Sequence, residues 1–291
     1  MKKRSYRFKL GNFECLLVLD GTFAYPHPAQ ALFTNASEER LKQVLREHKL
    51  DPETWEQYIS PYPSLVIYSA DHVVLVDTGG GSFAPTTGKL IENLKTEGIS
   101  PEDIDTVILT HSHPDHIGGN LDGEGKPTFP NARYVMWKEE WEFWTSGPDL
   151  SALKLPDHLK ESLLEFPVKN LLPIKNQLDL IDSEREIVPG IRAIAAPGHT
   201  PGHIALSVSS SGKTLLNIGD AVLHPVHLEQ PDWYAAVDLL SEKTVATRHR
   251  LLGKAAAEKN LVFAFHFPFP CLGHVIQKGE AWRWQPFELE A

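Results

Sequence analysis

Cysteine is scarce in this chain, which has two among 291 residues. Cys15 and Cys271 lie far apart in the sequence and form no CxxC pair, so a disulfide framework is not expected. Such frameworks are typical of small secreted domains that cannot build a large core, whereas 42% of the residues here are hydrophobic. We therefore expect a cytoplasmic protein whose stability comes from a sizeable core.

Long apolar runs and an excess of positive charge are also missing. No stretch approaches the ~20 consecutive apolar residues that a helix needs to span a bilayer. The chain has 28 Lys and Arg against 38 Asp and Glu, a formal net charge of −10. Because nucleic acids and anionic membranes attract basic surfaces, this balance argues against both as partners. A small-molecule substrate is compatible with it.

Histidine, by contrast, is abundant, with 14 copies. Three histidines and one aspartate fall within His111–His116, which reads HSHPDH. This segment directly follows residues 104–109, which we interpret as a buried strand. A solvated polar loop is the alternative interpretation, but a loop that ends a core strand is poorly placed for that. Metals such as zinc bind imidazole nitrogen and carboxylate oxygen, so the segment is predicted to be a metal-binding loop.

The spacing inside this loop suits two ions. In an extended stretch, His111 and His113 project to the same side and can bind one ion together. Pro114 disfavours a helical conformation of His113, which keeps that stretch extended. Beyond the proline the chain can turn, so Asp115 and His116 can face a second ion nearby.

Three later residues of ligand type also follow predicted strands. In the loop PGHTPGH either histidine could bind; His199 is favoured because it comes first after the strand, and His203 is expected to have a supporting role. Asp220 could bridge two metals with its two carboxylate oxygens. His266 directly follows the last buried strand. Since ligands collect at the carboxyl ends of strands in open sheets, these residues are expected to converge.

Hydrophobic periodicity predicts the elements that carry these loops. Strands are predicted over residues 6–10, 13–19, 65–68, 73–77, 104–109, 192–195, 204–208, 214–218, 261–265 and 282–287, with Asp20-Gly21 ending the second. Helices are predicted over residues 37–48, 87–97, 138–145, 157–165 and 242–259. This pattern favours two packed sheets with helices outside. We expect a single domain over residues 1–291, with residues 23–62 as a helical insertion or arm that covers the site or forms a homodimer.

The order of the ligand-type residues resembles the metallo-β-lactamase superfamily. The segment Leu75–Gly79 (LVDTG) also matches the strand that precedes the first motif of that family, and the resemblance covers residues 65–274. It implies an α/β fold, a four-layer αββα sandwich of two mixed sheets with a dinuclear metal site at one edge. It also implies that Asp77 braces the ligand loop. The ligands implied are His111, His113 and His199 for the first metal, Asp115, His116 and His266 for the second, and Asp220 as the bridge.

Within the superfamily, the chain resembles the branch that contains methyl parathion hydrolase and related lactonases. The aspartate at position 220 disfavours a true β-lactamase. Glyoxalase II-like members usually have an additional basic helical region at the C-terminus, where this chain has a predicted strand. Many acyl-homoserine lactonases carry a tyrosine where this chain has Leu223, so another group would have to assist the carbonyl oxygen. Cys271 is expected to be structural.

The resemblance implies a hydrolase. Two close metal ions can share one water and lower its pKa toward neutrality, and the resulting bridging hydroxide would attack a lactone or aryl ester, with phosphotriesters as side substrates. Asp115 is the candidate catalytic residue, because it could take up the released proton. The ligand set suits zinc, although iron, manganese or cobalt could replace it. The alternatives are a glyoxalase II-like thioester hydrolase and an iron-dependent oxidoreductase.

Aromatic residues are expected to give the site an apolar pocket, which suits a neutral ester better than a charged substrate. Core packing is the alternative role for each of them. His224 and His227 follow the bridging aspartate and are expected at the mouth of the pocket or on the surface. The predicted pocket residues are Phe23, Tyr25, Trp233, Phe267 and Phe269.

Overall fold

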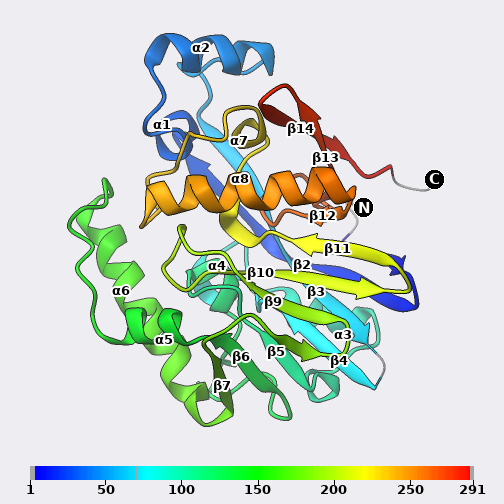
Figure 1. The fold of residues 1–291 in the computed structure, drawn as a ribbon. Helices are drawn as coiled ribbons and strands as arrows, with labels where there is room; N and C mark the ends of the chain where they lie inside the picture. Colours follow the sequence, from blue (N-terminus) through cyan, green and yellow to red (C-terminus); the bar gives the residue numbers. More distant parts are fainter. Residues whose placement is uncertain (1–3, 70, 289–291) are drawn as a thin grey trace.

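The computed structural model describes residues 4–69 and 71–288, and two seven-stranded sheets lie face to face at its centre (Figure 1). The first sheet contains, in spatial order, β1 (Ser5–Leu10), β2 (Phe13–Pro26), β3 (Gln57–Ser69), β4 (His72–Val76), β5 (Thr106–Ile108), β6 (Arg133–Trp137) and β7 (Leu178–Ile181). The second contains β8 (Glu186–Val188), β9 (Ile191–Ala195), β10 (Ile204–Ser210), β11 (Lys213–Asn217), β12 (Leu261–Phe263), β13 (Leu272–Lys278) and β14 (Ala281–Pro286). Each sheet therefore follows the order of the chain.

Both sheets are mixed. Strands β4 to β7 run parallel to one another, as do β11 and β12, while the other pairs are antiparallel. Parallel neighbours need crossover connections, and helices supply most of them. The helices are α1 (Pro28–Leu32), α2 (Glu38–Glu47), α3 (Leu90–Thr96), α4 (Pro114–Ile117), α5 (Lys138–Thr145), α6 (Asp157–Leu171), α7 (Val226–Glu229) and α8 (Ser241–Glu258). Short 3-10 turns cover Gly81–Phe83, Pro101–Asp103, Leu172–Gln177 and Gly219–Ala221.

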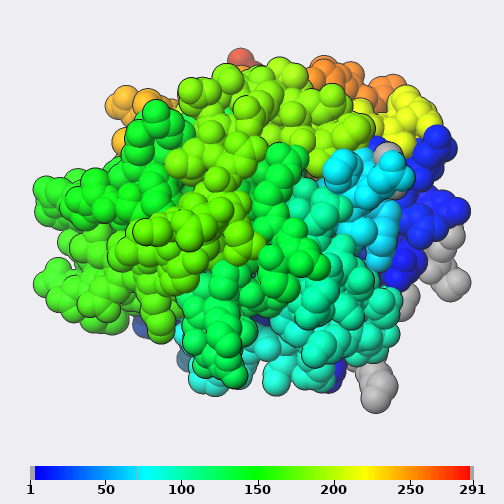
Figure 2. Space-filling model, turned by 90° about the horizontal axis from the view of Figure 1, so that it is seen from below, coloured from blue at the N-terminus to red at the C-terminus, as the bar shows by residue number. Residues whose placement is uncertain are grey.

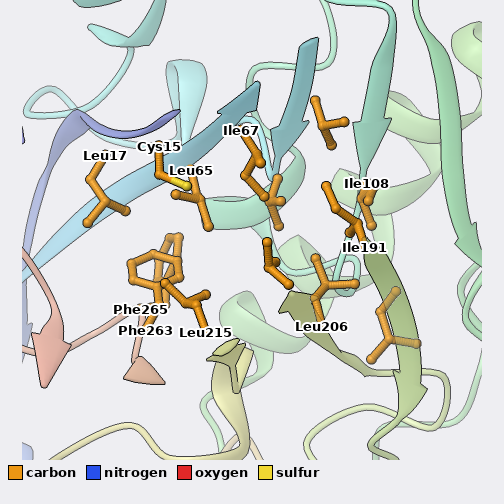
Figure 3. Packing of buried hydrophobic residues seen from close by; sticks show 14 of the residues in the cluster. Cys15, Leu17, Leu65, Ile67, Ile108, Ile191, Leu206, Leu215, Phe263 and Phe265 are labelled. Carbon is orange, nitrogen blue, oxygen red and sulfur yellow. The ribbon is translucent and has the colours of Figure 1, made fainter. Parts of the chain in front are cut away.

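The main core lies between the sheets, where side chains alternate from face to face. Leu65 and Ile67 of β3 point into this core, and Phe263 of β12 meets them from the second sheet (Figure 3). Val66, between the first two, points outward into the cluster that contains residues of α3 and α6. Val262 points outward beneath α8. This alternation produces the predicted four-layer αββα sandwich.

Helices cover the outer face of each sheet. Leu90 and Leu94 of α3 and Leu171 of α6 are buried against the first sheet. Seen from below, the surface on that side is formed largely by the middle of the chain, coloured from teal to green (Figure 2). On the opposite side, α8 lies across the second sheet (Figure 1). In the described part of the chain no helix is both long and apolar enough to cross a membrane.

The structure extends two predicted strands and adds others. The strand predicted over residues 65–68 is β3, which begins at Gln57. Strand β2 does not end at Asp20-Gly21 but continues through an irregularity there to Pro26. The polar Asp20 misled the prediction, although its carboxylate is buried and accepts bonds from the backbone N–H groups of Gly80, Gly88 and Leu90. Strands β6, β7, β8 and β13 were not predicted. Strand β6 runs directly into α5, so no turn residues mark its end, and β7 and β8 are short edge strands.

The segment 23–62 is partly strand and partly helix. The end of β2 and the beginning of β3 pair with each other past the ends of their neighbours β1 and β4, with Phe23 opposite Ser60 and Tyr25 opposite Tyr58. We call this paired region, residues 21–26 and 57–62, the β2–β3 extension. Helices α1 and α2 lie at its far end (Figure 1) and pack against Trp233 in the loop between α7 and α8. The extension therefore ties residues near the N-terminus to the loop that follows Asp220.

Candidate metal centre

Every predicted ligand lies just beyond the carboxyl end of a strand. His111–His116 follows β5, His199 follows β9, Asp220 follows β11 and His266 follows β12. His113 is extended at φ −69° and ψ 154°, and Pro114 occupies the first turn of α4, as the motif predicts. Strands from both sheets thus bring these residues to one edge of the sandwich.

The first group that could hold a metal ion comprises His111, His113, His199 and Asp220, all buried. Nε2 of His199 lies 2.9 Å from Nδ1 of His113 and 3.3 Å from Oδ2 of Asp220. Nε2 of His111 lies 3.8 Å from the same oxygen. Ligands about 2.0–2.2 Å from a tetrahedral zinc ion are roughly 3.4 Å apart, so these distances suit one cation.

The second group comprises Asp115, His116, Asp220 and His266, also buried. Nε2 of His266 lies 2.9 Å from Oδ2 of Asp220 and 3.6 Å from Oδ2 of Asp115. Nε2 of His116 lies 3.3 Å from Oδ1 of Asp220. Asp220 belongs to both groups, as expected for a carboxylate that bridges two ions.

Several atoms of these groups are buried without a hydrogen-bond partner. They include Nε2 of His111, Nε2 of His116 and Oδ1 of Asp220. Leaving a polar atom buried and unpaired costs on the order of 1–3 kcal/mol, so atoms left this way need an explanation. Converging imidazole nitrogens and carboxylate oxygens are the donor set of a divalent cation. The residues present therefore fit two such ions.

The electrostatics of the cluster are those of a site whose carboxylates attract either protons or a cation. Although burial opposes it, the charges of Asp220 and Asp77 hold the pKa of His116 well above its usual range. Bonds to Asp220 and Asp238 likewise outweigh burial and raise the pKa of His199 to about 9. A metal would therefore displace a proton from each of these two histidines.

Burial and then the neighbouring imidazoles hold the pKa values of His111 and His113 well below their usual range, which leaves their nitrogens neutral. Burial opposes ionisation of Asp220, but His266 and His116 outweigh it and hold the Asp220 pKa well below its usual value. Neutral imidazoles and an ionised carboxylate are the protonation states that bind metals.

Outer hydrogen bonds orient three of the histidines. Nδ1 of His116 lies 2.8 Å from Oδ2 of Asp77, so Asp77 has the bracing position that the resemblance implied. Nδ1 of His199 lies 2.8 Å from Oδ1 of Asp238. Nδ1 of His266 lies 2.9 Å from the hydroxyl of Ser60 on the β2–β3 extension. Such contacts fix the ring orientation and leave Nε2 free for a metal. Sequence reasoning missed Asp238 and Ser60, which carry no motif.

Glu140, on α5, braces two ligand loops at once and was also missed. Its carboxylate accepts bonds from the Ser112 backbone and the Trp144 indole on Oε1, and from the Thr200 hydroxyl and the Gly202 backbone on Oε2. Burial raises the pKa of Glu140, while these four donors favour its ionised form. An acidic residue on a short helix is usually exposed, so no sequence pattern indicated this role.

The structure places His199 in the first group and His203 outside both. Nδ1 of His203 lies 2.9 Å from the carbonyl oxygen of Ala196, and its Nε2 accepts a bond from the backbone N–H of Asp220. This is the supporting role expected for His203. Cys271 is buried in the core between the sheets, and its thiol donates to the carbonyl oxygen of Phe267, which fits a structural residue.

Two expectations about the pocket are wrong. Phe267 is fully buried beneath α8, where its ring packs against Trp284 at a centroid distance of 4.8 Å. His227 is fully buried rather than at a mouth, with Nε2 2.9 Å from the carbonyl oxygen of Leu32. His224 is 7% exposed. The rings of Phe33, Trp55 and Tyr58 enclose it, with their centroids 4.9–5.7 Å from that of the His224 imidazole.

Two tyrosines of the β2–β3 extension lie against the second group. The hydroxyls of Tyr25 and Tyr62 are 2.7 Å apart, and the Tyr25 hydroxyl is 3.4 Å from Oδ2 of Asp115. The rings of Tyr25 and His266 meet edge to face at 6.0 Å. Burial, followed by the charge of Asp115, holds the pKa of Tyr25 well above its usual value, so the hydroxyl keeps its proton. Tyr25 was predicted to line the pocket, and the structure puts it beside the second group.

The fold and these paired groups define a metallo-β-lactamase-type protein with a site for two metals. Residues 60–258 match the family model described as "Metallo-beta-lactamase superfamily", and the chain belongs to this superfamily. This confirms the resemblance inferred from the ligand order.

Among individual relatives, an N-acyl homoserine lactonase from Bacillus sp is 32% identical over 180 residues, which is 61% of this chain and 62% of that protein. The match therefore spans less than two thirds of this relative's length. Two solved structures match over nearly the whole chain. AidC, a dizinc quorum-quenching lactonase in complex with a product, has a TM-score of 0.88 at 28% identity and covers 99% of this chain and 98% of its own. The hydrolase AbOPH has a TM-score of 0.86 at 26% identity and covers 100% of both chains.

Proposed function

We propose that this chain is a metal-dependent lactonase that holds two zinc ions and opens the ring of acyl-homoserine lactones. The single observation that carries the proposal is that Asp220 is shared by two buried groups of ligand atoms. The proposed ligands are His111, His113 and His199 for the first ion, Asp115, His116 and His266 for the second, and Asp220 for both.

The choice of substrate class is supported by the relatives. The Bacillus relative is named as an N-acyl homoserine lactonase, and AidC was solved with the product of such a lactone. AidC matches this chain almost end to end, so the elements about its site have counterparts here. Aryl esters and phosphotriesters are proposed as side substrates, because they too present an electrophilic centre with an oxygen leaving group.

When bound, the two cations supply an activated water and positive charge for the substrate oxygen. The residues of the chain supply the rest. Asp77, Asp238 and Ser60 keep three ligand imidazoles in the orientation that leaves Nε2 free. Asp115 is the proposed proton acceptor, because its carboxylate lies at the edge of the second group nearest to Tyr25. The proton released on attack would pass to that carboxylate and then to the leaving oxygen.

Elemental analysis of the purified protein, followed by a substrate panel, tests the proposal. The panel contains N-hexanoyl homoserine lactone, an aryl ester, a phosphotriester and a glutathione thioester. We expect two zinc ions per chain and the highest kcat/KM on the lactone. A preference for the thioester would favour the glyoxalase II-like alternative. Iron in place of zinc, with oxygen consumption, would favour the oxidoreductase alternative. One ion per chain, or none, would contradict the dinuclear site.

The proton-acceptor role of Asp115 has its own test. Asp115→Asn keeps an oxygen ligand but removes the charge that accepts a proton. We expect kcat to fall by about 10²-fold or more, in the range of general-base catalysis. An unchanged metal content together with an unchanged kcat would remove Asp115 from the mechanism.

Three predictions about the surroundings of the protein are also part of this proposal. The acidic net charge supports a small molecule, rather than nucleic acid or a membrane surface, as the partner. Both cysteines are buried and free, which supports a cytoplasmic location. The β2–β3 extension exposes Ile59, with 64% of its surface accessible, and this apolar residue supports a homodimer through the extension. Sedimentation of the purified protein tests the dimer.

A further inference from the structure

We propose that the hydroxyl of Tyr25 donates a hydrogen bond to the substrate oxygen that gains negative charge at the second metal group. This inference rests on the proposed hydrolytic function and adds one residue to its mechanism. Tyr25 would then be a catalytic residue contributed by the β2–β3 extension, far in sequence from the motifs that supply the metal ligands.

The hydrogen bond between the two tyrosines runs from Tyr62 to Tyr25. Tyr62 is fully buried, and its hydroxyl lies 2.7 Å from that of Tyr25. A hydroxyl that is shielded from water is costly if its proton has no acceptor, so the Tyr62 hydroxyl donates to Tyr25. The oxygen of Tyr25 accepts that bond, which directs its own proton elsewhere.

The proton of the Tyr25 hydroxyl is poorly paired. The acceptor that the structure places within reach is Oδ2 of Asp115, at 3.4 Å. Hydrogen bonds between two oxygens are normally about 2.5–3.0 Å long, so this one is weak. A donor that is held in place and poorly paired is available for a better acceptor. A substrate oxygen bound beside Asp115 and His266 would be such an acceptor.

The neighbouring hydroxyls of Tyr58 and Ser60 bond to His266. The Tyr58 hydroxyl donates to the carbonyl oxygen of His266 at 2.6 Å. The Ser60 hydroxyl lies 2.9 Å from Nδ1 of the same residue. Both groups hold the ligand in place, whereas Tyr25 is only partly buried and bonds weakly to Asp115. Of these hydroxyls on the extension, Tyr25 is the one with a proton to offer.

Tyr25 is also held rigidly, and a donor stabilises a transition state best when it is already in position. Tyr25 pairs with Tyr58 in the ladder of the extension. Its ring meets that of Phe23 edge to face at 4.9 Å. The backbone and the neighbouring ring therefore both restrict Tyr25, and the hydroxyl needs little reorganisation when a substrate arrives.

The test compares Tyr25→Phe with Tyr62→Phe. Both remove one hydroxyl from the same pair and keep the aromatic ring, but only the first removes the proposed donor. Each protein is assayed on whichever member of the substrate panel the wild type hydrolyses fastest. For Tyr25→Phe we expect kcat to fall by about 10²-fold, as for loss of one oxyanion donor, with KM changed by less than about threefold. For Tyr62→Phe, which keeps the donor but removes the bond that directs its proton, we expect a smaller fall in kcat, of less than about tenfold.

Two further measurements separate assistance to the substrate from support of Asp115. Elemental analysis should find the same metal content in both variants and in the wild type. Calorimetric titration with N-hexanoyl-L-homoserine, whose carboxylate presents negative oxygens to the site, should show about tenfold weaker binding to Tyr25→Phe and little change for Tyr62→Phe.

Equal kcat values for the two variants would overturn the proposal. So would metal loss in Tyr25→Phe, which would make Tyr25 a positioning residue for Asp115. A wild type that hydrolyses no member of the panel would instead refute the proposed function, and this inference would fail with it.

Discussion

Nε2 of His203 accepts a hydrogen bond from the backbone N–H of Asp220 at 3.0 Å. A histidine outside both metal groups thus fixes the one residue that they share. The nearby backbone turns at Gly219 with a positive φ of 48°, and a Cβ there would lie 2.4 Å from the same nitrogen. The imidazole and the glycine therefore fit together to present the Asp220 carboxylate to both groups.

This contact predicts a specific defect in His203→Ala. The backbone N–H of Asp220 would lose its acceptor, and the Asp220 carboxylate would be held less firmly between the two groups. Metal affinity should therefore fall by about 10–100-fold, as it does when other hydrogen bonds that orient metal ligands are removed. The activity of fully loaded protein should change much less, because every ligand remains. Competition with a chromogenic chelator measures the affinity. An affinity equal to that of the wild type would show that Asp220 is held by the metals alone.

Glu140 predicts a large effect on stability. Glu140→Ala leaves four buried donors without their acceptor, and each such loss costs about 1–3 kcal/mol. We expect the free energy of unfolding to fall by about 3 kcal/mol or more, measured by denaturant titration. Glu139→Ala is the matched control, because Glu139 is the exposed neighbour on the same helix and should change stability by less than about 0.5 kcal/mol. Equal effects in the two variants would contradict the bracing role.

Removal of the metals should lower the melting temperature. Ligand binding to the native state stabilises it by about 2.7 kcal/mol when the free ligand is a hundredfold above Kd. The unpaired atoms of His111, His116 and Asp220 make the empty site costly as well. We expect a chelator to lower the melting temperature of the wild type by several degrees and to have little effect on the melting temperature of Asp220→Ala. Thermal unfolding of both proteins is measured by circular dichroism. A wild type insensitive to the chelator would contradict a metal-dependent fold of this edge.

His224 predicts a pH dependence of stability. Burial, followed by the charge of His48, lowers the pKa of His224 to about 3, against 6.5 for an unperturbed histidine. Between these values the unfolded chain binds more protons than the folded one, so the folded state loses stability as the pH falls from 6.5 toward 3. His224→Phe should reduce the slope of the unfolding free energy against pH by up to the contribution of one bound proton.

Denaturant titrations of both proteins at pH 5.0, 5.75 and 6.5, with chelator present throughout, measure this slope. Any constant effect of losing the bond from the Val226 backbone to Nδ1 of His224 cancels in the comparison of slopes. Parallel curves for the two proteins would show that His224 does not titrate between the folded and unfolded states in this range.

The metal-binding chemistry could be predicted from the order of the residues alone. The spacing of His111, His113, Asp115 and His116, with Pro114 between them, specifies an extended stretch followed by a helical turn, and the structure has both. Strand periodicity placed His199, Asp220 and His266 after strands, and the carboxyl ends of those strands meet at one edge. Local spacing and strand ends are written in the order of residues, which is why they could be predicted.

The surroundings of those ligands could not be predicted, because they depend on how distant segments pack. Glu140, Asp238 and Ser60 come from a helix, a loop and a strand with no motif. Asp238 and Ser60 bond to ligand histidines that lie 39 and 206 residues away in the sequence. Glu140 bonds to ligand loops that lie 28–62 residues away. Tyr25 reaches the site because β2 continues past Asp20, where the sequence indicated an end. Hydrogen bonds between distant segments depend on how the sheets and the β2–β3 extension pack, and local residue patterns do not encode that packing.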